Sequence, residues 1–272
     1  YISPDFRRHV MFQFYFPLLV DYNRNLFEVI CYSLGNEDSF TKTLKEKVDL
    51  WRNVNGMCAD KCAAIIYKDE VDILFDLAGH SADTGLAVLA YKPAPIQISG
   101  LGYFDTTGLG SVDYFLTDHY VDTNVDKRYF VEKLLWMPQS HFCYCKREDA
   151  PNVTEAPYKK NNFITFGCFN KYAKITDVCI TVWSEILSQV PESRLILKSM
   201  IYLDPSIVAE AQTRMIQAGI DIKRVEFRPA NESYMKEYLD IDIALDTFPY
   251  PGGGTTCDAL YMGVPTIVME GK

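Results

Sequence analysis

The stretch from Ile241 to Gly271 constrains the fold of this chain most, because signals for a strand, a glycine turn, a helix and a second strand follow one another directly. It reads IDIALDTFPYPGGGTTCDALYMGVPTIVMEG. The short apolar runs at 241–245 and 265–269 are typical of strands buried in a parallel sheet. Residues 258–262 between them are predicted to be helical. This order favours an α/β fold with a parallel sheet.

The glycine turn within this stretch is a candidate ligand site. Gly252, Gly253 and Gly254 let the backbone approach a ligand with no Cβ in the way. We expect either Thr255 or Thr256 to cap the helix that follows. The N–H groups at that helix start favour an anion, most naturally a phosphate. Asp258, one turn later, is placed to accept hydrogen bonds from sugar hydroxyls of the same ligand. The structural alternative is a glycine turn that only starts a helix. The neighbouring segments must decide between this alternative and a ligand site.

Composition narrows the class of protein. The 272 residues are 48% hydrophobic and carry a net charge of −9, with no run of lysine and arginine. We therefore expect neither nucleic acid nor an anionic membrane surface as a partner. No apolar run approaches the roughly 20 residues that span a bilayer. The eight cysteines are scattered, mostly in apolar contexts, and their spacings match no common zinc site. These features predict a soluble, cytoplasmic chain without a bound metal.

Strands and helices alternate in two series, separated by the polar, proline-containing segment 148–162. We predict an N-terminal doubly wound domain at 1–147, a linker at 148–162, a C-terminal doubly wound domain at 163–272, and a cleft between the domains that holds a nucleotide-bearing ligand. In the first series we expect an initial strand, a helix from near His9, strands at 27–33, 71–77, 96–101 and 112–117, and helices at 41–51, 60–68 and 84–91. In the second we expect strands at 163–169, 194–198 and 225–228 and helices at 177–189, 205–218 and 233–239.

Several polar residues fall where predicted strands end. Lys171 and Lys174 follow the first strand of the second domain, and Lys198 ends the next one. Lysines at strand ends beside a Gly/Thr helix start favour phosphate binding over simple surface charge. His9 and His80 follow strands of the first domain and are candidates to face the cleft. A histidine packed at a helix start is the structural alternative for His9.

Long, ordered motifs show what the chain resembles. They include DILFDLAGHSADTGL, KPAPIQISGLGYFDTTGL, VDYFLTD, ITFGCFNKYAKIT and DIALDTFPYPGGGTTCDALYMGVP. In these motifs the chain resembles the catalytic region of the O-linked N-acetylglucosaminyltransferase and Spindly-type glycosyltransferases, and is most similar to the bacterial and Spindly members. The resemblance implies a GT-B fold of two Rossmann-like domains and metal-independent, inverting transfer of a sugar from a nucleotide to Ser or Thr of proteins. It also implies an acceptor-side first domain, a nucleotide-sugar-side second domain lacking its C-terminal end, and a tetratricopeptide region beyond this chain that gathers protein acceptors.

The resemblance also implies roles for single residues. His9 matches a proposed catalytic base, and Lys174 matches the lysine that stabilises the departing diphosphate. The matched substrate-binding positions are Leu101, Gly102 and Phe104 in the sugar-pocket loop, His80, Asn170, Lys171, Lys198 and Tyr234, then Gly253, Gly254, Thr255 and Thr256 at the phosphate-binding helix start, and Asp258 at the ribose.

Three positions depart from the family pattern. Tyr234 stands where a histidine near the nucleobase is usual, Lys171 replaces Gln or Asn, and Gly100 replaces Trp. These departures leave two donors open, UDP-GlcNAc and GDP-fucose. They also leave open an inactive nucleotide-sugar binding module, or another GT-B enzyme such as a sugar-nucleotide epimerase.

Overall fold

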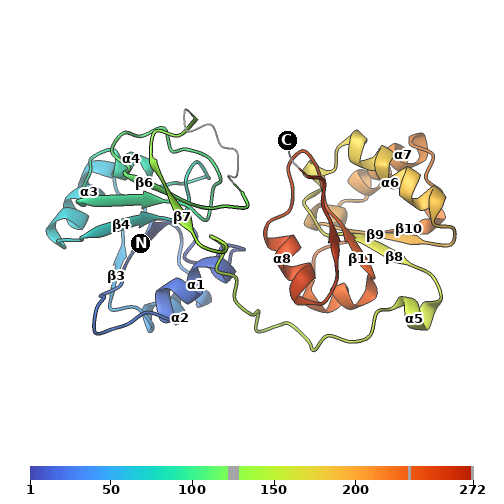
Figure 1. The fold of residues 1–272 in the computed structure, drawn as a ribbon, viewed down its shortest axis with the longest axis horizontal. Coiled ribbons are helices and arrows are strands. Elements are labelled where there is room, and N and C mark those ends of the chain that lie inside the picture. The colour runs from blue at the N-terminus through green and yellow to red at the C-terminus, as the bar shows by residue number, and fades with distance from the viewer. Residues whose placement is uncertain (122–128, 232–233, 271–272) are drawn as a thin grey trace. The chain divides into compact units, whose positions relative to one another are not determined.

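The computed structural model describes residues 1–121, 129–231 and 234–270. The chain divides into two compact units, Tyr1–Cys145 and Lys146–Lys272, and each contains one sheet (Figure 1). Every strand pairing in both sheets is parallel. The predicted α/β class with two doubly wound sheets is confirmed.

The sheet of the N-terminal unit has the strand order β3-β2-β1-β4-β5-β6-β7. Its direction of winding reverses between β1 and β4, which is the point where ligands bind in open parallel sheets. The strands are β1 (Ile2–Ser3), β2 (Ile30–Ser33), β3 (Leu50–Asn53), β4 (Ile73–Asp76), β5 (Ile96–Ser99), β6 (Tyr114–Asp118) and β7 (Lys133–Met137).

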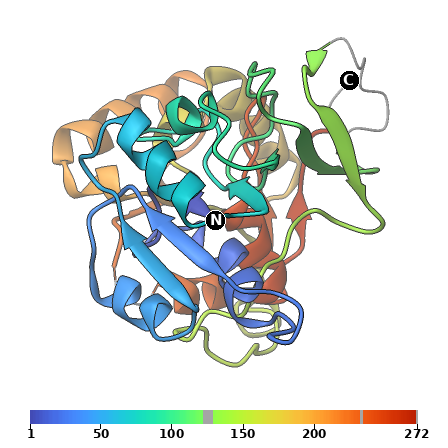
Figure 2. The same cartoon turned by 90° about the vertical axis from the view of Figure 1, so that its left-hand side faces the viewer.

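Both faces of this sheet are buried, because neighbouring side chains on a strand point to opposite faces. On β2, Cys31 joins the hydrophobic cluster that includes Tyr15 of α1 and Leu44 of α2, whereas Tyr32 joins the cluster built on α3 and α4. Figures 1 and 2 show helices on either side of the strands. The helices are α1 (Phe12–Val20), α2 (Ser39–Lys45), α3 (Ala59–Lys68) and α4 (Leu86–Leu89).

Two predictions for this unit were wrong. The helix expected at 41–51 ends at Lys45, and Leu50–Asn53 forms strand β3 instead. Strand β7 at Lys133–Met137 was not predicted at all. Both are edge strands of the sheet. Strand β3 ends in Arg52 and Asn53 and so lacks the continuous apolar run that identifies a buried strand, whereas β7 has a short apolar run, Leu134–Met137, that was overlooked.

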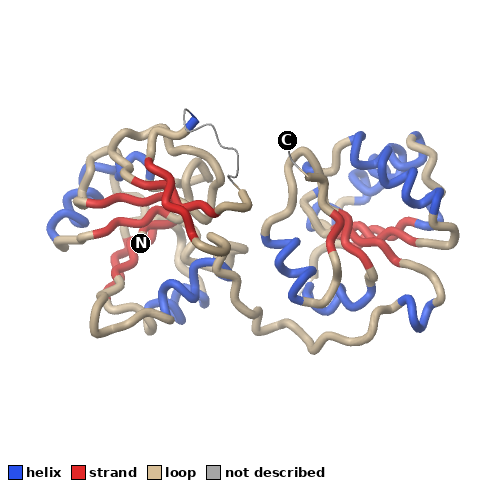
Figure 3. The backbone as a smooth tube through the Cα atoms, in the orientation of Figure 1, coloured by secondary structure: helices blue, strands red, loops and turns tan. Residues whose placement is uncertain are grey.

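The sheet of the C-terminal unit has the order β10-β9-β8-β11-β12, and its winding reverses between β8 and β11. Helices α6 and α7 cover one face through Trp183 and Met215, and η5 and α8 cover the other through Tyr238 and Ala259 (Figure 3). The strands are β8 (Thr165–Cys168), β9 (Arg194–Lys198), β10 (Val225–Arg228), β11 (Ile243–Leu245) and β12 (Thr266–Ile267). The α-helices are α5 (Tyr158–Asn161), α6 (Asp177–Gln189), α7 (Pro205–Gln217) and α8 (Gly254–Tyr261), and the 3-10 turns are η2 (Tyr172–Lys174), η3 (Met200–Leu203), η4 (Ile222–Arg224) and η5 (Tyr234–Asp240).

Two elements of this unit differ from expectation. The segment predicted as a helix at 233–239 is a 3-10 turn from Tyr234, and Ser233 lies outside the described residues. Helix α8 begins at Gly254 with Gly253 as its N-cap, and neither Thr255 nor Thr256 caps it. Glycine at an N-cap costs little compared with Ser, Thr, Asn or Asp. Among the described residues, no helix is long and apolar enough to cross a membrane.

Candidate functional site

The candidate site in the C-terminal unit lies at the carboxyl ends of β8 and β11, where the sheet reverses its winding. The segment after β8 carries Asn170 and Lys174, and the segment after β11 carries Asp246 and the glycine turn. The structure therefore brings together two segments far apart in the sequence. Both were predicted to contribute to a phosphate site.

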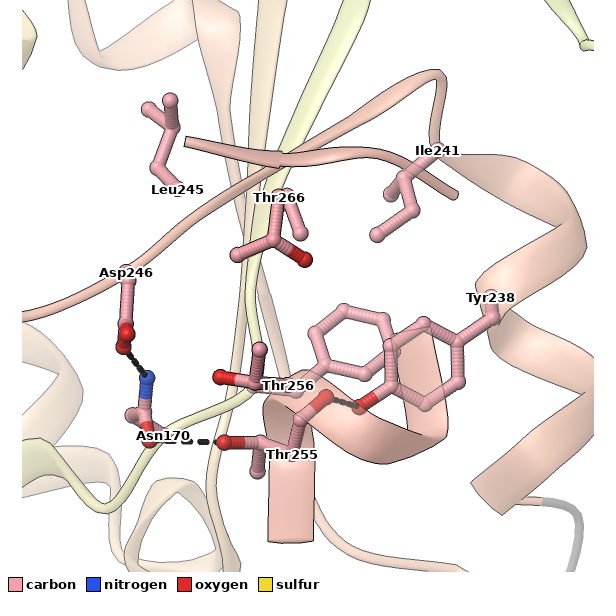
Figure 4. A pocket seen from close by; sticks show the side chains of 11 residues that line it. Asn170, Tyr238, Ile241, Leu245, Asp246, Thr255, Thr256 and Thr266 are labelled. Atoms are coloured by element: carbon pink, nitrogen blue, oxygen red, sulfur yellow. Dashed lines mark hydrogen bonds between the residues drawn. The ribbon is translucent and has the colours of Figure 1, made fainter. Parts of the chain in front are cut away.

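Asp246 organises these two segments, although the sequence analysis did not single it out. Its Oδ1 accepts hydrogen bonds from Asn170 Nδ2 at 2.9 Å, from the N–H of Thr247 at 2.7 Å and from the N–H of Gly252 at 2.7 Å. Asn170 Oδ1 in turn accepts a bond from Thr255 Oγ1 at 2.9 Å (Figure 4). The carboxylate thus fixes the start of α8 against the end of β8. A polar residue directly after an apolar strand was the available signal.

Gly252 and Gly253 occupy the turn for different structural reasons. A Cβ on Gly252 would lie 2.4 Å from Thr255 Oγ1 and 3.0 Å from Asn170 Oδ1, so packing requires glycine there. A Cβ on Gly253 would meet nothing within 4 Å. The backbone at Gly253 is therefore open on that side. The first N–H groups of a helix have no partner within the helix, so the start of α8 is suited to an anion.

Lys174 lies beside this helix start. Its Nζ donates to the carbonyl oxygen of Pro251 at 2.9 Å and lies 4.4 Å from the centre of the Tyr250 ring. Burial lowers the pKa of Lys174, the charge of Asp246 opposes that shift, and Lys171 adds to it. An anion bound nearby would relieve the cost of holding this ammonium half-buried. Lys171 is exposed.

Lys198 does not fit its predicted role. Its side chain is 2% exposed, and its Nζ donates to Glu237 at 2.9 Å and to the carbonyl oxygen of Pro229 at 2.7 Å. Removing a buried ammonium from its carboxylate is costly. We therefore assign Lys198 to the packing of η5 against β9 and not to phosphate.

Tyr234 and Asp258 lie next to each other, with Asp258 buried on α8. Burial, followed by the charge of Asp258, raises the pKa of Tyr234 above its ordinary range, so its hydroxyl stays protonated. That hydroxyl lies 2.8 Å from the hydroxyl of Tyr238, which donates to the carbonyl oxygen of Thr255 at 3.2 Å. The two tyrosines thereby connect η5 with the first turn of α8. Arg147, assigned to the first domain from the sequence, packs on the Tyr234 ring in the C-terminal unit.

The N-terminal unit has its own candidate residues at the end of β1. His9 Nδ1 lies 3.5 Å from Asp5 Oδ2, and the His9 side chain is 39% exposed. The same Nδ1 accepts a hydrogen bond from the N–H of Met11 at 3.4 Å. His9 is therefore accessible and has a carboxylate partner in the same SPDF turn, which the sequence analysis did not identify.

The loops after β4 and β5 carry the other predicted residues. His80 Nε2 lies 3.1 Å from the carbonyl oxygen of Thr106, which ties the two loops together. Leu101 is buried with φ at +69°, a backbone conformation that is uncommon for a residue with a side chain and is typical of functional loops. The Phe104 ring is 48% exposed. The predicted sugar-pocket loop is thus held in one defined conformation.

A buried aspartate–histidine pair lies beneath Phe104 and was not predicted. His141 Nδ1 lies 2.5 Å from Asp118 Oδ2, and the two side chains are 4% and 3% exposed. Burial alone would raise the pKa of Asp118, but hydrogen bonds from the N–H and ring of His141 and from the N–H groups of Val121 and Tyr120 lower it to about 2. Asp118 is therefore ionised at neutral pH.

Solved structures with similar folds define the class of protein. A mutant of the Thermobaculum terrenum O-GlcNAc transferase matches with a TM-score of 0.94 and 31% identity, covering 100% of this chain and 52% of that one. An Anabaena protein solved with UDP-glucose matches with a TM-score of 0.57 and 12% identity over 97% of this chain and 78% of that one, which shows the fold alone. The chain has the GT-B fold of glycosyltransferases.

Sequence relatives give the family. The model of the family "Glycosyl transferase family 41" matches residues 1–160 and 153–272. The chain belongs to that family. The probable UDP-N-acetylglucosamine–peptide N-acetylglucosaminyltransferase SPINDLY of Solanum lycopersicum is 39% identical over 100% of this chain and 30% of its own length. The corresponding probable transferase SEC of Arabidopsis thaliana is 28% identical over 99% of this chain and 28% of its own length. The chain therefore spans less than a third of these relatives.

Gly102 provides a test of the loop packing. A Cβ at Gly102 would lie 2.0 Å from the carbonyl oxygen of Leu77 and 3.1 Å from Ala78 Cα, both backbone atoms. We expect Gly102→Ala to lower the free energy of unfolding by about 1–3 kcal/mol, because backbone must move. Gly110→Ala, where a Cβ meets nothing within 4 Å, should change it by less than about 0.5 kcal/mol. Equal urea midpoints for the two variants would contradict this packing.

The low pKa of Asp118 predicts a pH dependence of stability. Because the folded pKa of about 2 lies below the unfolded value, the contribution is present above about pH 4 and is lost as the pH falls through 2. The wild type should therefore be more stable than Asp118→Asn at pH 7, and about 2 kcal/mol of that difference should disappear by pH 2. Thermal unfolding of both proteins across this range measures the difference. A constant difference would show that Asp118 keeps an ordinary pKa.

Proposed function

We propose that this chain is the catalytic region of an inverting, metal-independent glycosyltransferase that moves GlcNAc from UDP-GlcNAc to Ser or Thr hydroxyls of proteins. The observation that carries the proposal is the arrangement around Asp246, which sets the open backbone of Gly253 and the ammonium of Lys174 beside one helix start. The SPINDLY and SEC relatives are probable UDP-N-acetylglucosamine–peptide N-acetylglucosaminyltransferases, which supports this donor and a peptide acceptor. A tetratricopeptide region outside this chain is the proposed means of gathering acceptors.

In the proposed reaction, the acceptor hydroxyl oxygen bonds to the anomeric carbon of the sugar while the bond from that carbon to the diphosphate breaks. The hydroxyl proton passes to His9, whose imidazolium Asp5 would stabilise. The diphosphate leaves with the negative charge, which Lys174 and the N–H groups of α8 stabilise in place of a divalent cation. Asp258 and Tyr234 bind the nucleoside, and Leu101, Gly102 and Phe104 line the sugar pocket.

Protein O-fucosylation from GDP-fucose is the second candidate. Tyr234 replaces the histidine that the family usually places near the nucleobase, and its ring lies beside Arg147 and Asp258. The surroundings of the base therefore differ from those of the typical UDP-GlcNAc enzyme. Comparing the turnover of UDP-GlcNAc and GDP-fucose with the same acceptor protein separates the two candidates.

Lys174→Met tests the assignment of the lysine. We expect the variant to lose at least about 100-fold in transfer rate, because it removes a charge aimed at the departing diphosphate while the side chain contributes little to packing. Donor consumption and acceptor labelling are measured together. Lys223→Met, at an exposed lysine of η4, is the matched control and should keep full activity.

Unchanged transfer by Lys174→Met would refute the proposed role of the lysine. Two further outcomes would replace the proposed function itself. Binding of the donor without transfer would favour an inactive nucleotide-sugar binding module, and turnover of the donor without any acceptor would favour a sugar-nucleotide epimerase.

A further inference from the structure

Arg147 is held in place on the C-terminal unit by three neighbours. Its guanidinium carbon lies 5.3 Å from the centre of the Tyr234 ring. Its Nε and Nη2 donate to the two oxygens of Asp149 at 3.0 and 3.2 Å, and the N–H of Ala150 donates to the carbonyl oxygen of Arg147 at 3.2 Å. Only 22% of the side chain is exposed. Arg147 is therefore an ordered cation and not a freely solvated surface charge.

The ring beneath Arg147 belongs to the candidate nucleotide site. Tyr234 lies beside Asp258, and its hydroxyl lies 2.8 Å from that of Tyr238, which donates to the carbonyl oxygen of Thr255 in the first turn of α8 at 3.2 Å. Asp258 is 4% exposed and attracts Arg147 electrostatically. A continuous set of contacts thus joins Arg147 to the helix start.

The charge of Asp258 explains why a cation is needed beside the start of α8. A buried carboxylate one turn into α8 would repel a diphosphate bound at the start of the same helix, and low-polarity surroundings strengthen that repulsion. Arg147 packs on the Tyr234 ring and is close enough to Asp258 for the two charges to attract each other. It offsets the carboxylate charge and also covers one face of the tyrosine ring.

We propose that Arg147 is a positioning residue for the nucleotide, acting through Tyr234 and Asp258 to set the affinity of the site for a nucleoside diphosphate. This inference rests on the proposed function. Arg147 lies in the segment that enters the C-terminal unit. We assign it a part in donor binding and no part in bond breaking. Arg147 acts on the ground state and the transition state alike, so its removal raises KM and leaves kcat nearly unchanged.

Arg147→Met tests the proposal because methionine keeps much of the apolar stem and removes the charge. We expect KM for the nucleotide sugar, and the Kd of UDP or GDP measured by calorimetry, to rise at least about 10-fold, with kcat within about 3-fold of the wild type. Arg147→Lys restores the charge and should recover most of the affinity. Arg194→Met is the matched control, because Arg194 also stacks on an aromatic ring, that of Phe163 at 4.5 Å, but at the amino end of β9. It should leave Kd and KM unchanged.

The outcomes separate this inference from the proposed function. If the wild type binds UDP or GDP and Lys174→Met impairs transfer while Arg147→Met changes neither KM nor Kd, only the role of Arg147 is overturned. A loss of kcat without a change in KM, or an equal effect of Arg194→Met, overturns it as well. A wild type that binds neither nucleotide overturns both. Thermal midpoints of all variants within a few degrees of the wild type show that folding is not the cause.

Discussion

The carboxylate of Asp246 is the interaction on which the C-terminal unit's candidate site depends. It joins the end of β8, through Asn170, to the glycine turn, through the N–H of Gly252. Because the carboxylate is 5% exposed and its Oδ1 takes hydrogen bonds from three donors, the turn and the start of α8 are held in one arrangement before any ligand binds. Preorganised N–H groups of this kind stabilise negative charge without reorganisation.

The N-terminal unit uses the same device at the equivalent strand. Asp76 ends β4, which follows the reversal of winding as β11 does in the other sheet. It accepts bonds from Ser99 Oγ at 2.8 Å and from the N–H groups of Ala78 and Gly79 at 3.2 and 2.8 Å. Burial raises the pKa of Asp76, and these bonds oppose the shift. In each unit, a buried carboxylate at the switch-point strand fixes the loop that carries candidate ligand-binding residues.

The sequence predicted elements with a regular pattern better than contacts. Strand β9 and helix α6 have the expected bounds, because an apolar run and an amphipathic period identify them directly. Edge strand β10 also has the expected bounds, whereas edge strand β3 has no apolar run and the short run of edge strand β7 was overlooked. Lys174, Asn170 and Thr255 were predicted from motifs, but that Asp246 joins Asn170 to the glycine turn becomes clear only when β8 and β11 are paired. The burial of Lys198 and the packing of Arg147 on Tyr234 depend on tertiary contacts that no local pattern encodes.

We infer that the start of α8 binds the diphosphate of a nucleotide. A crystal structure of this chain with UDP or GDP, whichever calorimetry shows to bind, is the decisive experiment. We expect phosphate oxygens within hydrogen-bonding distance of the N–H groups of Gly254 and Thr255 and of Lys174 Nζ, with Asp246 unmoved. A diphosphate bound elsewhere, with solvent at the start of α8, would contradict it.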